Sequence, residues 1–144
     1  MKYIKLFEGV VENRKITLEL KKRLALLLVD YLNFFDLEAE LSNVRVYCKL
    51  KNNTRGSINL TKSGNIMEIE WSYNDYFREE LDILTDWLKE KNTINKPYMT
   101  INTSRIKTYM NIRVNEIDEF MNTIRELIDS GEIQLRRNAN KYNV

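Results

Sequence analysis

The first clear pattern along the chain is a helical repeat of apolar residues between Thr17 and Phe35. Its apolar positions recur every three or four residues, at Leu20, Leu24, Leu27, Leu28, Tyr31 and Phe35. This spacing predicts an amphipathic helix, capped by Thr17 because a threonine hydroxyl readily accepts from the free N–H groups of a first turn. Further apolar residues widen the stripe in the second half. The helix should therefore either lie at the centre of the core or bury a second face against a partner.

Shorter alternating patterns follow this helix and predict β-strands. The expected strands cover residues 43–50, 57–60 and 65–73, with turn-forming residues between them, and a further short strand is expected within residues 2–11. Within residues 65–73, Met67, Ile69 and Trp71 alternate with Glu68 and Glu70, which predicts an antiparallel meander with one solvated face. The two glutamates share that face because they are two residues apart, and no third ligand accompanies them, so no metal site is expected.

The periodicity becomes helical again from Asn74 or Asp75 to about Lys91, with an apolar face made by Tyr76, Phe77, Leu81, Leu84, Trp87 and Leu88. The remaining elements are expected to be a short strand (97–101), a helix (104–110), a tight turn (111–113), a helix (115–129) and a terminal hairpin (132–144). Ser130 and Gly131 should stop the last helix, with the glycine supplying a left-handed cap. These patterns predict an α/β module over residues 1–74 and a second domain over residues 75–144.

The order of elements over residues 75–144 resembles the winged helix-turn-helix superfamily. The apolar positions that would lock such a unit are Ile106, Met110, Ile112, Ile117, Phe120, Ile124, Leu127 and Ile133. The resemblance implies a C-terminal winged helix-turn-helix. Together with the N-terminal patterns, which predict a helix packed on a small antiparallel sheet, it gives the expected α+β fold. The stretch from the tight turn to Gly131 is about one helical turn longer than is typical of the superfamily, which leaves the register of the third helix open.

Composition narrows the function classes. The 144 residues carry a net charge of +2 and include no histidine and one cysteine, Cys48. The commonest general base and a glycine-rich phosphate loop are both missing, so neither an enzyme nor a bound cofactor is expected. No apolar run reaches membrane-spanning length and the start lacks a signal-peptide core, which predicts a cytoplasmic protein. Abundant Asn, Lys, Ile and Tyr are typical of AT-rich coding and favour a phage or another mobile element as the origin.

The resemblance also implies binding of double-stranded DNA. The residues expected to contact DNA are Thr103, Ser104, Arg105, Lys107, Arg113, Asn115, Asn122, Arg136, Arg137, Asn138 and Lys141. A second basic patch is expected at Lys49, Lys51 and Arg55, near the aromatic residues Tyr47, Trp71 and Tyr73. The protein would then be a small DNA-binding regulator. It would act as a homodimer through helix 17–35, because paired half-sites multiply weak contacts.

The acidic third helix keeps a second hypothesis open. Between Asn111 and Gly131 there are two basic and five acidic residues, and carboxylates that face phosphates lower the affinity for DNA. The residues Glu116, Asp118 and Glu119 could instead bind a host protein or nucleoprotein. The chain would in that case be a non-enzymatic interaction or inhibitor protein of a mobile element, for example of anti-defence or anti-CRISPR type.

Overall fold

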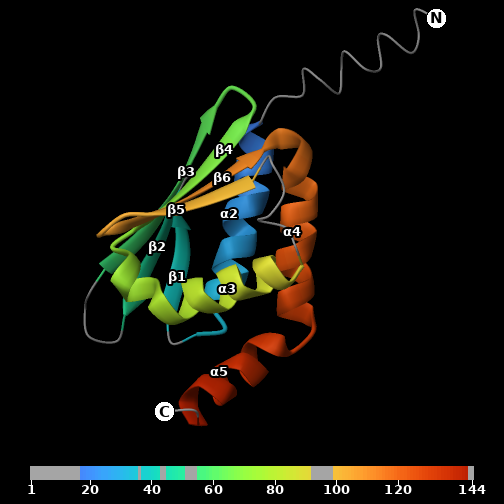
Figure 1. Ribbon diagram of the computed structural model, residues 1–144. Helices are drawn as coiled ribbons and strands as arrows, with labels where there is room; N and C mark the ends of the chain where they lie inside the picture. The colour runs from blue at the N-terminus through green and yellow to red at the C-terminus, as the bar shows by residue number, and fades with distance from the viewer. Residues whose placement is uncertain (1–16, 36, 43–44, 51–54, 92–98, 143–144) are drawn as a thin grey trace, which may run out of the picture.

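The computed structural model describes residues 17–35, 37–42, 45–50, 55–91 and 99–142 (Figure 1). Its helices are α2 (Leu18–Leu32), the short 3-10 helix η1 (Asn74–Phe77), α3 (Arg78–Glu90), α4 (Val114–Asp129) and α5 (Glu132–Tyr142). Its strands are β1 (Leu37–Ser42), β2 (Arg45–Leu50), β3 (Arg55–Ser63), β4 (Ile66–Ser72), β5 (Met99–Thr103) and β6 (Lys107–Arg113). The predicted α+β class is confirmed, while the strand expected within residues 2–11 lies outside the described residues.

The six strands form one antiparallel sheet in the order β1-β2-β3-β4-β6-β5. Helices α2 and α4 lie against one face of this sheet, and α3 crosses their C-terminal halves (Figure 1). Burial alternates along β4 and β6: Met67, Ile69 and Trp71 face the helices, whereas Glu68 and Glu70 are half-buried on the opposite face. The sheet therefore has one face in the core and one polar face, as the alternating pattern predicts.

The N-terminal half follows the local pattern closely. The hydroxyl of Thr17 accepts from the N–H of Leu20 at 3.1 Å, so the predicted cap is confirmed together with the helix that packs on the sheet. The meander of β2, β3 and β4 is also confirmed. Strand β1 was not predicted, because its alternation of leucine, alanine and glutamate is short and composed of good helix formers. It forms by pairing with β2 and packing against α2.

A single cluster of buried apolar residues crosses the boundary expected at residue 74. Strand β4 pairs with β6, for example Ile69 with Met110, so one sheet joins the two halves of the chain. Two buried hydrogen bonds join the helices as well. The Tyr31 hydroxyl donates to the carbonyl of Glu80 at 2.6 Å, and the Trp87 indole N–H donates to the carbonyl of Thr123 at 2.9 Å. Burial, reinforced by the Glu80 and Glu79 carboxylates, raises the pKa of Tyr31 well above its usual value.

The prediction of a helix over residues 104–110 is wrong, because most of this segment belongs to strand β6. The sequence of this segment fits both the helical and the strand period. Ile106 and Met110 are one helical turn apart, whereas Thr108, Met110 and Ile112 are two residues apart, as on one face of a strand. The structure selects the alternation, with those three residues buried and Tyr109 and Asn111 half-buried. The reason is tertiary, since β4 presents a row of backbone hydrogen-bonding groups that β6 satisfies.

The prediction of a terminal hairpin over residues 132–144 is also wrong, because Glu132–Tyr142 forms the helix α5. Gly131 does adopt the predicted left-handed conformation, with a φ of 79°, but the chain turns from α4 directly into another helix. Side chains four residues apart hold this helix: Arg136 contacts Glu132 at 3.2 Å, and Gln134 donates to Asn138 at 2.9 Å. Residues 99–142 therefore lack the helix, helix and hairpin order of a winged helix-turn-helix.

Candidate functional site

The residues expected to contact DNA are distributed over three places. The turn between β5 and β6 carries Ser104 and Arg105, and the strand ends beside it carry Thr103 and Lys107. The opposite end of β6 and the exposed side of α4 carry Arg113, Asn115 and Asn122. The remaining residues, Arg136, Arg137, Asn138 and Lys141, lie on α5. Strand β6 separates the first two places by seven residues, or about 20 Å. The set therefore does not form the single surface that a recognition helix and its wing would provide.

Arg136 joins α5 to α3. Its guanidinium forms two hydrogen bonds to the Glu90 carboxylate, at 3.1 and 2.5 Å, and lies over the Trp87 ring at 5.2 Å from the centroid. The hydrogen bond from Arg136 lowers the pKa of Glu90, and the same bond raises the pKa of Arg136. A guanidinium held in this way stabilises the packing of α5 and is poorly placed to bind a phosphate.

Arg137 has a similar structural role beside it. Its Nε donates to Glu79 at 2.6 Å, and its Nη1 donates to the backbone carbonyl of Phe34 at 2.8 Å. The guanidinium also lies over the Phe35 ring at 5.0 Å. This side chain therefore connects α5 both to α3 and to the end of α2.

The second basic patch is only partly within the described residues. Lys49 and Arg55 are register partners in β2 and β3, while Lys51 lies outside the described residues. Of the aromatic residues proposed beside them, Trp71 is fully buried on the inner face and packs edge-on against Phe77. It belongs to the core, and it cannot stack on a nucleic-acid base.

The glutamates of the polar sheet face form ordinary surface contacts. Glu70 pairs with Lys107 at 2.9 Å and accepts from the Ser72 hydroxyl at 3.3 Å. The hydrogen bond to Glu70 raises the pKa of Lys107, with the negative charge of Glu70 adding to the effect. Within the described part of the chain, no group of three or more His, Cys, Asp or Glu residues could hold a metal ion.

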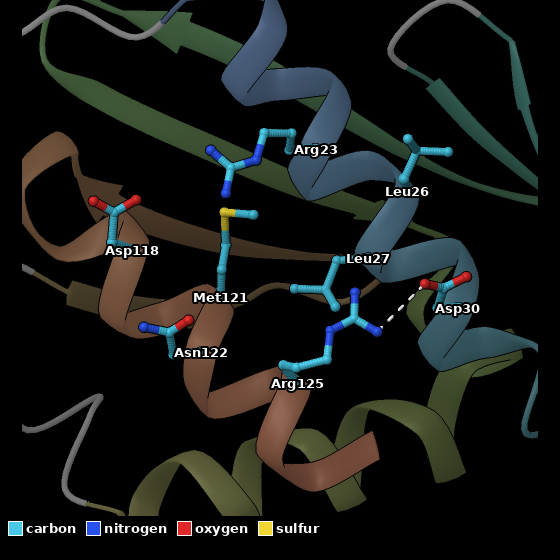
Figure 2. Close-up of a pocket in the computed structure, with 8 residues that line it drawn as sticks. All are labelled: Arg23, Leu26, Leu27, Asp30, Asp118, Met121, Asn122 and Arg125. Atoms are coloured by element: carbon cyan, nitrogen blue, oxygen red, sulfur yellow. Dashed lines mark ion pairs between the residues drawn. The ribbon is translucent and has the colours of Figure 1, made fainter. Parts of the chain in front are cut away.

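The acidic residues Glu116, Asp118 and Glu119 lie on the first two turns of α4, with Asp118 and Glu119 exposed. Asp118 also borders a groove of about 780 Å³ between α2 and α4 (Figure 2). An ion pair between Arg125 and Asp30 crosses this groove at 3.5 Å. The groove brings together two helices that are about 100 residues apart in the sequence, which no local pattern could have predicted.

A further surface, unrecognised in the sequence, begins at Tyr73. Continued alternation of β4 after Ile69 and Trp71 would direct Tyr73 into the core. Instead its backbone adopts a φ of 58°, and its side chain is 58% exposed. Tyr73 is the one non-glycine residue with a positive φ in the described part of the chain. A tyrosine in this conformation costs about 1 kcal/mol, and such strain is concentrated at functional sites.

Asn74 connects the Tyr73 backbone to the turn between β5 and β6 through hydrogen bonds. Its backbone N–H donates to the carbonyl of Ile106 at 2.9 Å. Its side-chain amide donates to the carbonyl of Ser104 at 3.1 Å and to the Thr108 hydroxyl at 3.3 Å. One asparagine therefore holds two segments together that lie 30 residues apart.

The β5–β6 turn is closed by its own hydrogen bonds. The N–H of Ser104 donates to the carbonyl of Lys107 at 2.8 Å, and the N–H of Lys107 donates to the Ser104 hydroxyl at 3.2 Å. Arg105 and Ile106 lie at the tip, and both are exposed. The turn thus presents a cation and an apolar side chain on an ordered backbone.

We call the surface formed by Tyr73, Tyr76, Arg105 and Ile106 the Tyr73 patch. The rings of Tyr73 and Tyr76 lie 5.9 Å apart, and Ile106 is 52% exposed. A hollow of about 300 Å³ adjoins the patch, lined by η1, α3 and the turn. The patch combines exposed aromatic and aliphatic area with an arginine beside a concave surface, which is typical of protein-binding sites.

These features define an α+β protein whose antiparallel sheet is covered by helices on one face and which carries an ordered, exposed aromatic patch. Comparisons with protein-family models, with curated proteins and with solved structures return no match. Among the described helices, none is long and apolar enough to cross a membrane.

Proposed function

We propose that this chain is a non-enzymatic binding protein that recognises a partner protein through the Tyr73 patch. The observation that carries the proposal is the strained, outward-facing Tyr73, held beside Tyr76 and Ile106 by the hydrogen bonds of Asn74. Tyrosine and arginine are enriched among the residues that dominate binding energy in protein interfaces. A backbone that is already ordered before binding loses little entropy on association.

The charges around the patch favour a protein over a nucleic acid. Lys107 is paired with Glu70, and Arg78 is paired with Asp75 at 3.5 Å. Asp82 adds a further carboxylate to the adjoining hollow. Nucleic-acid affinity depends on cations that can neutralise phosphates, whereas here most cations are offset by neighbouring carboxylates. The interaction-protein hypothesis is therefore retained, with the Tyr73 patch as its main surface in place of the acidic residues of α4.

A photo-crosslinking amino acid at position 106 tests the proposal in cells. Position 135 is the matched control, because Leu135 is 62% exposed and Ile106 is 52% exposed. We expect a discrete protein adduct from position 106 that is absent from position 135 and is lost when Tyr73→Ala is added. The partner, once identified and purified, should bind the Tyr73→Ala protein about 30-fold more weakly than the wild type, as for a residue worth about 2 kcal/mol of binding energy.

Two results would refute the proposal. The first is an adduct pattern from position 106 that equals the control or is unaffected by Tyr73→Ala. The second is fluorescence anisotropy showing that random duplex or single-stranded DNA binds with a steep salt dependence that Arg105→Glu abolishes. In that case the turn would be part of a nucleic-acid interface, as the sequence-based hypothesis holds.

A further inference from the structure

Four charged residues alternate in sign around the groove between α2 and α4 (Figure 2). Arg23 and Asp30 lie on α2, whereas Asp118 and Arg125 lie on α4. Within each pair the residues are seven positions apart, so they lie on the same side of their helix about two turns, or roughly 10 Å, from each other. All four side chains are exposed, and Arg125 and Asp30 stay about half exposed although they form an ion pair with each other across the groove.

The centre of this surface is apolar. The buried Leu27 of α2 and the half-buried Met121 of α4 lie between the four charges, and Leu26, which is 52% exposed, lies on the side of α2 that points away from α4 (Figure 2). Leu18, two helical turns before Leu26 and 59% exposed, extends the apolar area along α2. We call the surface formed by Arg23, Leu26, Asp30, Asp118, Met121 and Arg125 the α2–α4 patch. The patch therefore combines apolar side chains with charged residues at its edges, as protein interfaces commonly do.

The alternating rim is complementary to itself. In a symmetric dimer the twofold axis lies in the plane of the interface. Each patch therefore faces the same patch of the partner subunit, rotated by 180° about that axis. With the axis parallel to the helices, Arg23 faces Asp118 of the partner subunit and Asp30 faces Arg125 of the partner subunit. With the axis perpendicular to the helices, Arg23 faces Asp30 of the partner subunit and Asp118 faces Arg125 of the partner subunit. Either axis joins every positive corner to a negative one.

We infer that the α2–α4 patch binds a second copy of this chain and forms a twofold-symmetric dimer. A uniformly acidic or uniformly basic partner would place like charges against two of the four corners, and like charges in an interface select strongly against a partner. A second copy places an opposite charge against each of the four corners. Its own Leu26 and Met121 would also cover the apolar side chains of the patch. This inference concerns a surface separate from the Tyr73 patch and does not depend on the proposed function.

Charge-swap mixing tests the inference with the full-length chain. Sedimentation equilibrium should give the wild type a mass of about twice the 17.3 kDa of the chain. Arg23→Asp, Asp118→Arg and Asp30→Arg should each weaken self-association by at least about ten-fold, because each places two like-charge pairs in the symmetric interface. Leu26→Arg should do the same, whereas Leu135→Arg should have no effect. Circular dichroism of each variant checks that the fold is kept.

Mixtures of two variants then identify the axis. Arg23→Asp mixed with Asp118→Arg restores both opposite-charge contacts if the axis is parallel to the helices, whereas Arg23→Asp mixed with Asp30→Arg restores them if it is perpendicular. Restoration of the heterodimer in one of these mixtures is the expected result. A wild type that remains monomeric at high concentration would overturn the inference. So would a dimer that Leu26→Arg leaves intact, or variants that no mixture restores.

Discussion

The Tyr73 patch and the α2–α4 patch are built on different kinds of backbone. The α2–α4 patch lies on two regular helices, and its charges are spaced by the helical repeat. The Tyr73 patch lies on a left-handed residue, a 3-10 turn and a hairpin turn, and Asn74 holds these parts together. The first patch alternates its charges and is complementary to itself. The second has no such symmetry, and the partner that we propose for it is a different protein.

This difference indicates where strain is needed. A helix displays side chains outward without any backbone cost, so the residues of the α2–α4 patch can be exchanged with little effect on folding. The Tyr73 ring is exposed only because the chain leaves the regular strand conformation, and the fold must offset that cost. Substitutions near the two patches should therefore change stability and binding in different combinations.

The largest effect is expected from Gly56→Ala, below the Tyr73 patch. A Cβ at this position would lie 2.5 Å from the Phe77 ring, which is buried and packs against Trp71. Phe77 must shift and displace η1, so we expect the free energy of unfolding in urea to fall by about 1–3 kcal/mol. Crosslinking from position 106 should weaken, while self-association should stay unchanged. Ser57→Ala, on the opposite face of β3, should change stability by less than about 0.5 kcal/mol.

If Gly56→Ala reduced self-association as well as the crosslink, the two patches would not be independent. The core below the Tyr73 patch would then also determine the conformation of the α2–α4 patch.

A smaller effect is expected from Tyr31→Phe, at the joint between α2 and α3. The variant removes the hydrogen bond to the Glu80 carbonyl and should lower the free energy of unfolding by about 1–2 kcal/mol at neutral pH. Because the folded state raises the pKa of Tyr31, this residue's contribution is fully present below about pH 10, its unfolded value. It is lost as the pH rises towards the folded value.

Urea unfolding from pH 8 to 11 should therefore show a steeper loss of stability in the wild type than in Tyr31→Phe. Tyr76→Phe, which removes the hydroxyl of an exposed tyrosine, is the matched control. Equal slopes for all three proteins would show that Tyr31 does not remain protonated in the folded state. Neither variant should alter self-association, since Tyr31 is fully buried and Tyr76 belongs to the Tyr73 patch and not to the α2–α4 patch.

The smallest effect has the opposite sign. Tyr73→Asn should raise the free energy of unfolding by about 0.5–1 kcal/mol, because asparagine tolerates the left-handed conformation better than tyrosine. The same substitution should abolish the position-106 adduct. Leu26→Asn, on the regular helix α2, should give no such gain. Thermal unfolding followed by circular dichroism checks both variants, and a destabilised Tyr73→Asn protein would show that the ring supports the fold and is not held there for binding.

Local patterns predicted the N-terminal half of the fold and little of the candidate sites. The spacing of Leu20, Leu24 and Leu28 requires a helix, and the alternation around Ile69 requires a strand, because no other regular structure buries these sets on one side. The prediction that Arg136 and Arg137 contact DNA depends on their charge and on their place in the expected terminal hairpin. Their partners Glu90 and Glu79 lie 46 and 58 residues away and are invisible to any local pattern.

Several features were determined by the amino-acid sequence alone. They are the Thr17 cap, the helices α2, α3 and α4, the meander of β2 to β4, and the left-handed Gly131. Each depends on contacts within a few residues, where the apolar period and the steric freedom of glycine decide the conformation.

Tertiary contacts decided the rest. Intrinsic preferences differ by only a fraction of a kcal/mol per residue, so residues 107–113 became a strand once β4 provided a pairing edge. Residues 132–142 became a helix whose arginines could reach the carboxylates of α3. The exposure of Tyr73 likewise depends on hydrogen bonds between Asn74 and a turn 30 residues later. Where local preferences are nearly balanced, the long-range partner determines the structure, and both candidate surfaces of this protein lie where distant segments meet.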